Sequence, residues 1–242
     1  MQTPIGLISL WSQGDWIIRL VALLLLAMSL ASWMVILLKV IDLIQFKRLA
    51  RSTEAFWHSP DFALGLNALG PQAANPFVQL ARSGFEASSH HRNTQAQLHD
   101  ALDISDWISR ALRNAMDDST ARLQSGLAIL ASVGSTAPFV GLFGTVWGIY
   151  HALMGIGASG QASIDKVAGP IGESLVMTAL GLAVAIPAVL GYNALVRGNK
   201  SALTRLTRFA HDLHAYFVTG ARVGAVQPDG HAANVVLSMK KA

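Results

Sequence analysis

Cysteine is absent from the 242-residue chain, and charged side chains make up only 13% of it. The lack of cysteine excludes disulfide bridges and thiolate metal ligands. The net charge is only +4, and no stretch interleaves basic with aromatic residues as a nucleic-acid-binding module does. A nucleophile, a base and an orienting group are nowhere grouped together, so nothing in the sequence predicts an enzyme.

Long apolar runs are what the sequence contains instead. Three of them are long enough for a membrane-spanning helix, which needs about 17–25 residues. They lie at residues 20–38, 123–164 and 167–196, and only the last is interrupted by an acidic residue. The first run is too long for a signal peptide and lacks a small-residue cleavage site, so we expect it to remain as an anchor. The sequence predicts an all-α membrane protein with three transmembrane helices and long cytoplasmic helical extensions.

The basic residues predict the orientation of these spans. They cluster after the first and third runs, whereas the link 155–166 holds one Lys and one Asp. By the positive-inside rule, the N-terminus is periplasmic and the C-terminus cytoplasmic. We expect a periplasmic N-terminus (1–15), three transmembrane helices (16–39, 128–156 and 167–196), a cytoplasmic helical domain (40–127), a periplasmic loop (157–166), and a cytoplasmic C-terminal helix and tail (197–242).

Helix signals mark the cytoplasmic segments. Asp15 is placed to cap a helix that starts at Trp16 and, without Pro or Gly, continues to about Phe56. Thr94 and Gln97 form a capping box. From there an apolar stripe with three- and four-residue steps, Leu98 to Leu127, predicts a helix with no break before Ala137, which reaches Gly155 if it continues into the second span. We expect the stripe to pack against the extensions of the first and third spans. His211 and His214 lie three residues apart but lack a third ligand, so we expect no metal and no cofactor.

Glycines recur at seven-residue intervals in the second span. Small residues on one helix face allow backbones to approach closely within a membrane, so this face predicts a contact between helices or subunits. The Thr145 hydroxyl lies beside it, and bonding to its own helix is the alternative to a functional role. The glycines expected to serve packing are Gly134, Gly141, Gly144 and Gly148, with Gly181 on the third span.

Glu173 is the one acidic residue of the third run. An ionised carboxylate in hydrocarbon costs about 2.5–3.5 kcal/mol, and such residues often mark ion or proton paths. The helix from Glu173 to Arg197 is about 36 Å long at 1.5 Å per residue, longer than a ~30 Å hydrocarbon core. Glu173 therefore lies either within the membrane or at the outer headgroup level, where it is simply hydrated.

Two stretches carry a family resemblance: APFVGLFGTVWGIYHAL (Ala137–Leu153) and VAGPIGESLVMTALGLAVAIPAVLGYN (Val167–Asn193). They resemble the paired signature of the ExbB/TolQ/MotA family of proton-driven motor subunits, and the segments GIYHAL and VAGPIGES are closer to the ExbB branch than to the TolQ branch. The resemblance covers both long spans, and the three-span layout agrees with the family over the whole chain. Ser174 and Met177 depart from it, since relatives usually have smaller residues there.

The resemblance implies a pentameric ring in the bacterial inner membrane whose pore holds the helices of an ExbD-like dimer. Such a ring uses the proton motive force to energise a TonB-like protein, which drives import of iron-siderophores and vitamin B12 across the outer membrane. The pore residues of the family correspond to Thr145, Glu173 and Thr178, and the essential proton-carrying Asp belongs to the partner.

Other functions remain open at this point. A TolQ-like subunit of the Tol-Pal system is the alternative within the family. A structural scaffold for a partner-borne proton path is another, with Glu173 meeting a cation or a helix N-terminus of a partner. A solute transporter is disfavoured because three unequal spans contain neither repeated halves nor discontinuous helices.

Overall fold

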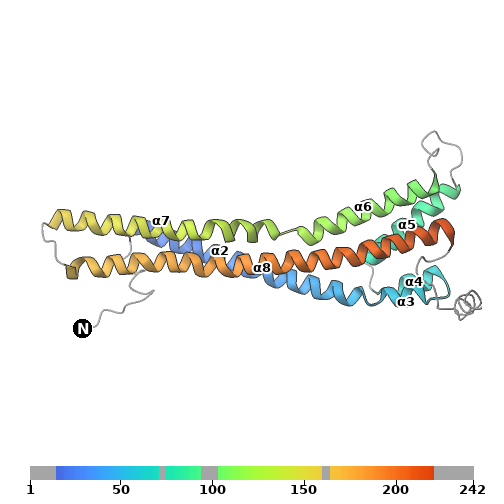
Figure 1. The fold of residues 1–242 in the computed structure, drawn as a ribbon, viewed down its shortest axis with the longest axis horizontal. Coiled ribbons are helices and arrows are strands. Elements are labelled where there is room, and N and C mark those ends of the chain that lie inside the picture. Colours follow the sequence, from blue (N-terminus) through green and yellow to red (C-terminus); the bar gives the residue numbers. More distant parts are fainter. Residues whose placement is uncertain (1–14, 71–74, 94–102, 160–163, 221–242) are drawn as a thin grey trace, which may run out of the picture. The chain divides into compact units, whose positions relative to one another are not determined.

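The computed structural model describes residues 15–70, 75–93, 103–159 and 164–220, and every regular element in these ranges is a helix (Figure 1). Three of the helical stretches are long and apolar enough to cross a membrane, which confirms the all-α, three-span prediction for the described residues. The helices are α2 (Trp16–Leu49), α3 (Thr53–Trp57), α4 (Phe62–Ala68), α5 (Pro76–Asn93), α6 (Ile104–Gln124), α7 (Leu127–Ser159) and α8 (Ile164–Thr219). The ends of α7 and α8 include part of the stretch 157–166 that we predicted as a loop.

The chain divides into two compact units, and α2 and α8 contribute to both. The first, here called the apolar unit, contains residues up to Leu43 together with Gln124–Lys200. The second, here called the aromatic unit, contains Ile44–Leu123 and the chain from Ser201 onward.

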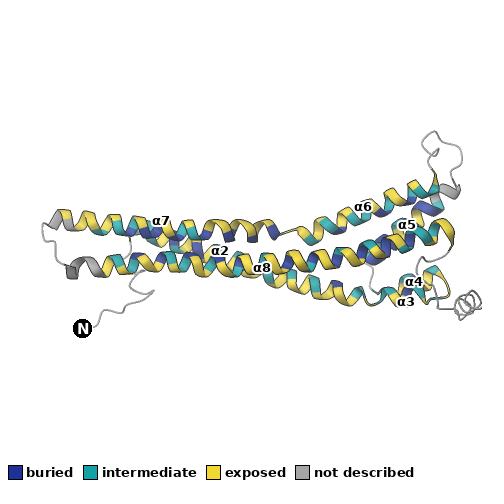
Figure 2. Ribbon diagram, viewed as in Figure 1, coloured by how far each residue is buried: buried dark blue, intermediate teal, exposed yellow. Residues whose placement is uncertain are grey.

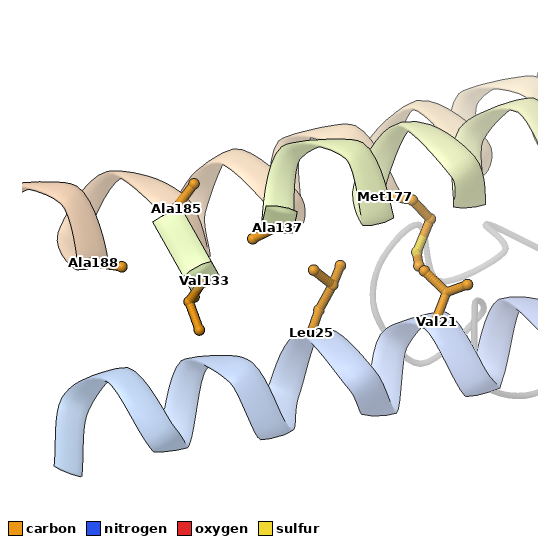
Figure 3. Close-up of a cluster of buried hydrophobic side chains, with 7 residues drawn as sticks. All are labelled: Val21, Leu25, Val133, Ala137, Met177, Ala185 and Ala188. Carbon is orange, nitrogen blue, oxygen red and sulfur yellow. The ribbon is translucent and has the colours of Figure 1, made fainter. Parts of the chain in front are cut away.

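The apolar unit packs α2, α7 and α8 around a narrow core (Figure 3). Alanines and a glycine-rich face leave little side-chain volume between α7 and α8, so a few larger residues fill the space toward α2. The buried cluster consists of Val21, Leu25, Val133, Ala137, Met177, Ala185 and Ala188. Many of the other large apolar side chains are exposed, as Phe139 is at 71%. Exposed residues recur along α2, α7 and α8 (Figure 2). So extensive an apolar surface fits hydrocarbon or further helices rather than water.

The predicted unbroken helix from Thr94 to Gly155 is wrong at Gly126. α6 ends at Gln124 and α7 begins at Leu127, because Gly126 has a φ of +81° that an α-helix does not contain. Glycine adopts this left-handed conformation at no steric cost and often ends helices in this way. Lys39 of α2 donates a hydrogen bond of 2.8 Å to the Ser125 hydroxyl at the same break. The expected start at Thr94 lies outside the described residues.

Replacing Gly126 with alanine is expected to lower the free energy of unfolding by about 1–2 kcal/mol, because a Cβ atom disfavours the left-handed conformation. The new atom would also lie 3.3 Å from a methyl group of Val35. Thermal unfolding of the purified protein measures the effect. Gly155→Ala is the matched control, since a Cβ there has nothing within 4 Å; equal stability of the two variants would contradict the prediction.

Aromatic side chains hold the second unit together. Phe209 of α8 contacts Phe56 and Phe77, with ring centroids 5.5 Å apart in each pair. α2 ends at Leu49 rather than continuing to Phe56, so that expectation is also wrong. The hydroxyls of Ser52 and Thr53 donate to the carbonyl oxygens three residues earlier, at 2.7 and 2.9 Å, and such side-chain bonds compete with a continuing helix.

The predicted apolar stripe lies on α6, and its members Ile108 and Leu112 are buried. A Cβ atom placed on Gly84 of α5 would lie 3.3 Å from Leu112 and even closer to Phe217 of α8. The stripe therefore packs against the extension of the third span, as expected, and also against α5, which the sequence analysis did not foresee. Residues Leu98 and Leu102 lie outside the described ranges.

Leu112→Asp is expected to cost about 3 kcal/mol or more, because it removes a buried apolar side chain and buries an unpaired carboxylate in its place. Leu112 is only 4% exposed. Accumulation in membranes and the unfolding midpoint in detergent measure the loss. Asn114→Asp adds the same charge at an exposed position of α6 and serves as the control; wild-type stability of Leu112→Asp would refute the packing of this stripe.

Candidate functional site: a hydroxyl pair between two apolar helices

Thr145 of α7 and Thr178 of α8 meet in the interior of the apolar unit. Their hydroxyl oxygens are 2.5 Å apart, and Thr145 Oγ1 also lies 3.1 Å from the Ser174 carbonyl and 3.2 Å from the Gly141 carbonyl. Carbonyls only accept, and a hydroxyl has a single proton to donate. Either hydroxyl can be the donor in the contact between the two threonines. When Thr145 donates to one of the carbonyls, it accepts from Thr178, and the Thr178 oxygen keeps free acceptor capacity.

Close helix approach makes this contact possible. A Cβ atom on Gly141 would lie 2.6 Å from the Met177 carbonyl oxygen, and one on Gly181 would lie 2.7 Å from the Ala137 carbonyl oxygen. Backbone atoms are the nearest neighbours on both sides, so these two positions have no room for a side chain. One turn away, Thr145 and Thr178 are short enough to bridge the remaining gap.

The other predicted packing glycines face different neighbours. Gly134 lies against the side chain of Val189, and Gly148 lies against the hydroxyl of Ser174. A Cβ atom on Gly144 would lie 3.1 Å from Val21 of α2 and 3.2 Å from Met177 of α8, so this glycine faces both helices. The glycine stripe is thus in contact along α7, whereas Gly155 at its end has nothing near it.

The two residues that depart from the family pattern lie inside the helix packing. Met177 is 0% exposed and belongs to the buried cluster that contains Val21 (Figure 3). Ser174 donates a 2.8 Å hydrogen bond to the Pro170 carbonyl, while its own carbonyl faces Thr145. Ser174 was not among the predicted site residues, although its four-residue spacing from Thr178 places both on one helix face.

Glu173 lies beside this pair rather than in it. At 100° per residue, the five positions between Glu173 and Thr178 turn the helix by about 140°. Glu173 instead shares a face with Met177 and Leu180, four and seven residues later. It is partly exposed, and no described residue forms a hydrogen bond or an ion pair with its carboxylate. The structure therefore brings Thr145 and Thr178 together and leaves the Glu173 carboxylate available.

The histidines of α8 take a different position. His214 Nε2 lies 3.1 Å from the hydroxyl of Ser105 on α6, and His211 is exposed. Among the described residues, no group of three or more His, Cys, Asp or Glu side chains is arranged to hold a metal ion.

A paired hydroxyl and one acidic side chain, carried on long apolar helices, are typical of membrane subunits that conduct ions. The described residues offer groups that exchange or relay protons. The comparisons with known proteins agree with this class: residues 74–208 match the MotA/TolQ/ExbB proton channel family. The chain belongs to that family, which confirms the resemblance of its two long motifs.

Individual relatives refine the assignment. The chain is 46% identical over 218 residues to the biopolymer transport protein ExbB of Xanthomonas campestris pv. campestris, with 88% of this chain and 86% of the relative covered. It is 42% identical over 212 residues to the ExbB of Neisseria meningitidis serogroup A, covering 84% and 93%. The Tol-Pal system protein TolQ of Pseudomonas aeruginosa is 35% identical over 210 residues, covering 86% and 90%. Relatives named ExbB thus share more identity with the chain than this TolQ does.

Proposed function

We propose that the protein is the proton-channel subunit of an inner-membrane motor that works with an ExbD-like single-span partner and energises a TonB-like protein. The motor uses the proton motive force to drive outer-membrane import of iron-siderophores and vitamin B12. The observation that carries this proposal is the contact between Thr145 of α7 and Thr178 of α8. Thr178 lies five residues after Glu173, the only acidic residue of the third apolar run. The higher identity to relatives named ExbB favours this role over the Tol-Pal system.

In the proposed assembly, five copies form a ring around the partner helices, with the N-terminus periplasmic and the C-terminus cytoplasmic. The outward apolar side chains of α2, α7 and α8 supply surface for lipid and neighbouring copies. Glu173 has no partner among the described residues, so its carboxylate remains available to a partner helix. Thr178, with free acceptor capacity, then receives a hydrogen bond from water or from a protonated carboxyl.

Complementation tests the proposal. The chain is expressed with its ExbD-like partner in a strain that lacks its own ExbB and TolQ proteins, and two activities are measured. We expect restored ferric-siderophore uptake, with the partner co-purifying at the mass of a ring. Restored envelope integrity without restored uptake would instead assign the chain to the Tol-Pal system, and co-purification without either activity would assign it a scaffold role.

A further inference from the structure

The Asp15 carboxylate connects the first turn of α2 to α7. Its Oδ1 accepts a 2.7 Å hydrogen bond from the backbone N–H of Trp16, the first residue of α2. Its Oδ2 accepts a 3.2 Å hydrogen bond from Trp147 Nε1 and lies 3.9 Å from His151 Nδ1. One oxygen of this carboxylate therefore contacts the start of α2, and the other faces two side chains of α7.

We propose that Asp15, Trp147 and His151 form a clamp that positions the part of α7 that carries Thr145, and that the clamp tightens when His151 is protonated. The proposal rests on the proposed function for its flux readout. Asp15 and Trp147 are positioning residues here, because they act through the α7 backbone rather than on the transported proton.

Helix register links the clamp to the hydroxyl pair. Trp147 lies two residues after Thr145 and directly before Gly148, which packs on Ser174 of α8. Ile18, one turn into α2, lies 3.6 Å from the Cβ position of the same glycine. The carbonyl of Ser174 in turn faces the Thr145 hydroxyl at 3.1 Å. A shift of α7 away from Asp15 would therefore also disturb the Thr145 contacts within about one helical turn.

The geometry gives the clamp a direction of pH dependence. Histidine is the side chain that most readily gains a positive charge in the physiological pH range. A falling pH adds a positive charge at 3.9 Å from the Asp15 oxygen and strengthens the clamp. The side chain of His151 is 61% exposed and that of Asp15 is 24% exposed, so solvent screens the ion pair. We therefore expect protonation of His151 to favour the closed clamp, and with it the proton flux, only about two- to fivefold.

Other charged or titratable groups lie at the same level of the three packed helices. They are Arg19, which follows Asp15 by one turn of α2, and Tyr150 on α7. Glu173 on α8 is next to Ser174 and belongs to the proposed proton path. Variants at Asp15 and His151 keep all three of these side chains, so the two variants losing the pH dependence alike is the result that the clamp predicts.

Two measurements test the clamp in the complex with its partner. The first follows the indole ¹⁵N–¹H resonance of Trp147, assigned with Trp147→Phe, between pH 8 and pH 5.5. The second measures proton flux into vesicles at a fixed pH gradient, with the pH on the side of the α2 start set to 7.5 or 5.5. The variants are Asp15→Ala, Asp15→Asn and His151→Gln, and Tyr150→Phe is the control because it keeps the ring next to Trp147.

We expect Asp15→Ala to move the Trp147 resonance to that of an unbonded indole and to lower flux about tenfold, since a hydrogen bond to a charged acceptor is lost. Asp15→Asn and His151→Gln should keep most of the flux at pH 7.5 but lose the pH-dependent shift and the two- to fivefold gain. Tyr150→Phe should match the wild type.

A Trp147 resonance that Asp15→Ala leaves in place, or a full pH-dependent shift in Asp15→Asn, would overturn the clamp. A wild-type complex without flux would contradict the proposed function alone, because the resonance still decides the clamp.

Discussion

Replacing Gly141 with leucine is expected to prevent α7 and α8 from packing and so to abolish a stable assembly. The nearest atoms to a side chain at this position are the Met177 carbonyl oxygen and the Gly181 Cα, at 2.6 and 3.0 Å from the Cβ position. A flexible side chain can move aside, but a helix backbone cannot move without carrying its whole turn. Overpacking a well-packed core costs about 1–3 kcal/mol, and a clash with backbone belongs at or above the upper end of that range.

The same substitution would also separate the hydroxyl pair. Thr145 follows Gly141 by one helical turn, and Thr178 directly follows Met177, so helices forced apart at Gly141 can no longer keep the 2.5 Å contact. The oligomeric mass in detergent and the thermal unfolding midpoint measure the effect. Gly155→Leu is the matched control, because it belongs to the same seven-residue repeat and has nothing within 4 Å of its Cβ position. Wild-type mass and midpoint for Gly141→Leu would show that the contact is dispensable.

The sequence predicted features that depend on composition and spacing. Long apolar runs indicate spans because nothing shorter crosses the hydrocarbon, and the glycine repeat indicates a face on which backbones approach. The structure places Gly141 and Gly181 against each other's helix backbones. The pairing of Thr145 with Thr178 was not predictable from periodicity, because it depends on the register between α7 and α8, which brings together two residues 33 positions apart in sequence.

The wrong predictions share a physical cause. Gly126 was expected to be tolerated within a helix, but its left-handed conformation ends α6. α2 was expected to reach Phe56, but the hydroxyls of Ser52 and Thr53 bond to backbone carbonyls at its end. In both places helix propensity allows the helix to continue, but a local backbone conformation or a side-chain hydrogen bond ends it. The contact of Asp15 with Trp147 was unforeseen for a related reason, since only tertiary packing brings two residues 132 positions apart together.

Replacing Glu173 with glutamine is expected to eliminate TonB-dependent uptake while leaving the assembly intact. Glutamine has nearly the same volume as glutamate and retains hydrogen-bonding atoms, but it does not ionise or carry a proton. No described residue forms a hydrogen bond or an ion pair with the Glu173 carboxylate, so folding of the chain does not depend on its charge. We therefore expect an unchanged unfolding midpoint, an unchanged oligomeric mass and full binding of the ExbD-like partner.

Ferric-siderophore uptake should fall to the background of a strain without the subunit, since an acidic residue in an apolar span serves proton or ion movement far more readily than packing. Glu86→Gln on α5 makes the same chemical change at an exposed position outside the three apolar runs and should leave uptake unchanged. Thr178→Val keeps the side-chain shape and removes the hydroxyl, so it should lower uptake without eliminating it if the hydroxyl only assists the carboxylate.

Wild-type uptake with glutamine at 173 would remove this carboxylate from the proton path and leave the proton to the partner alone. Failure of that variant to assemble would assign the carboxylate a structural contact with another chain, because no such contact exists among the described residues of this one.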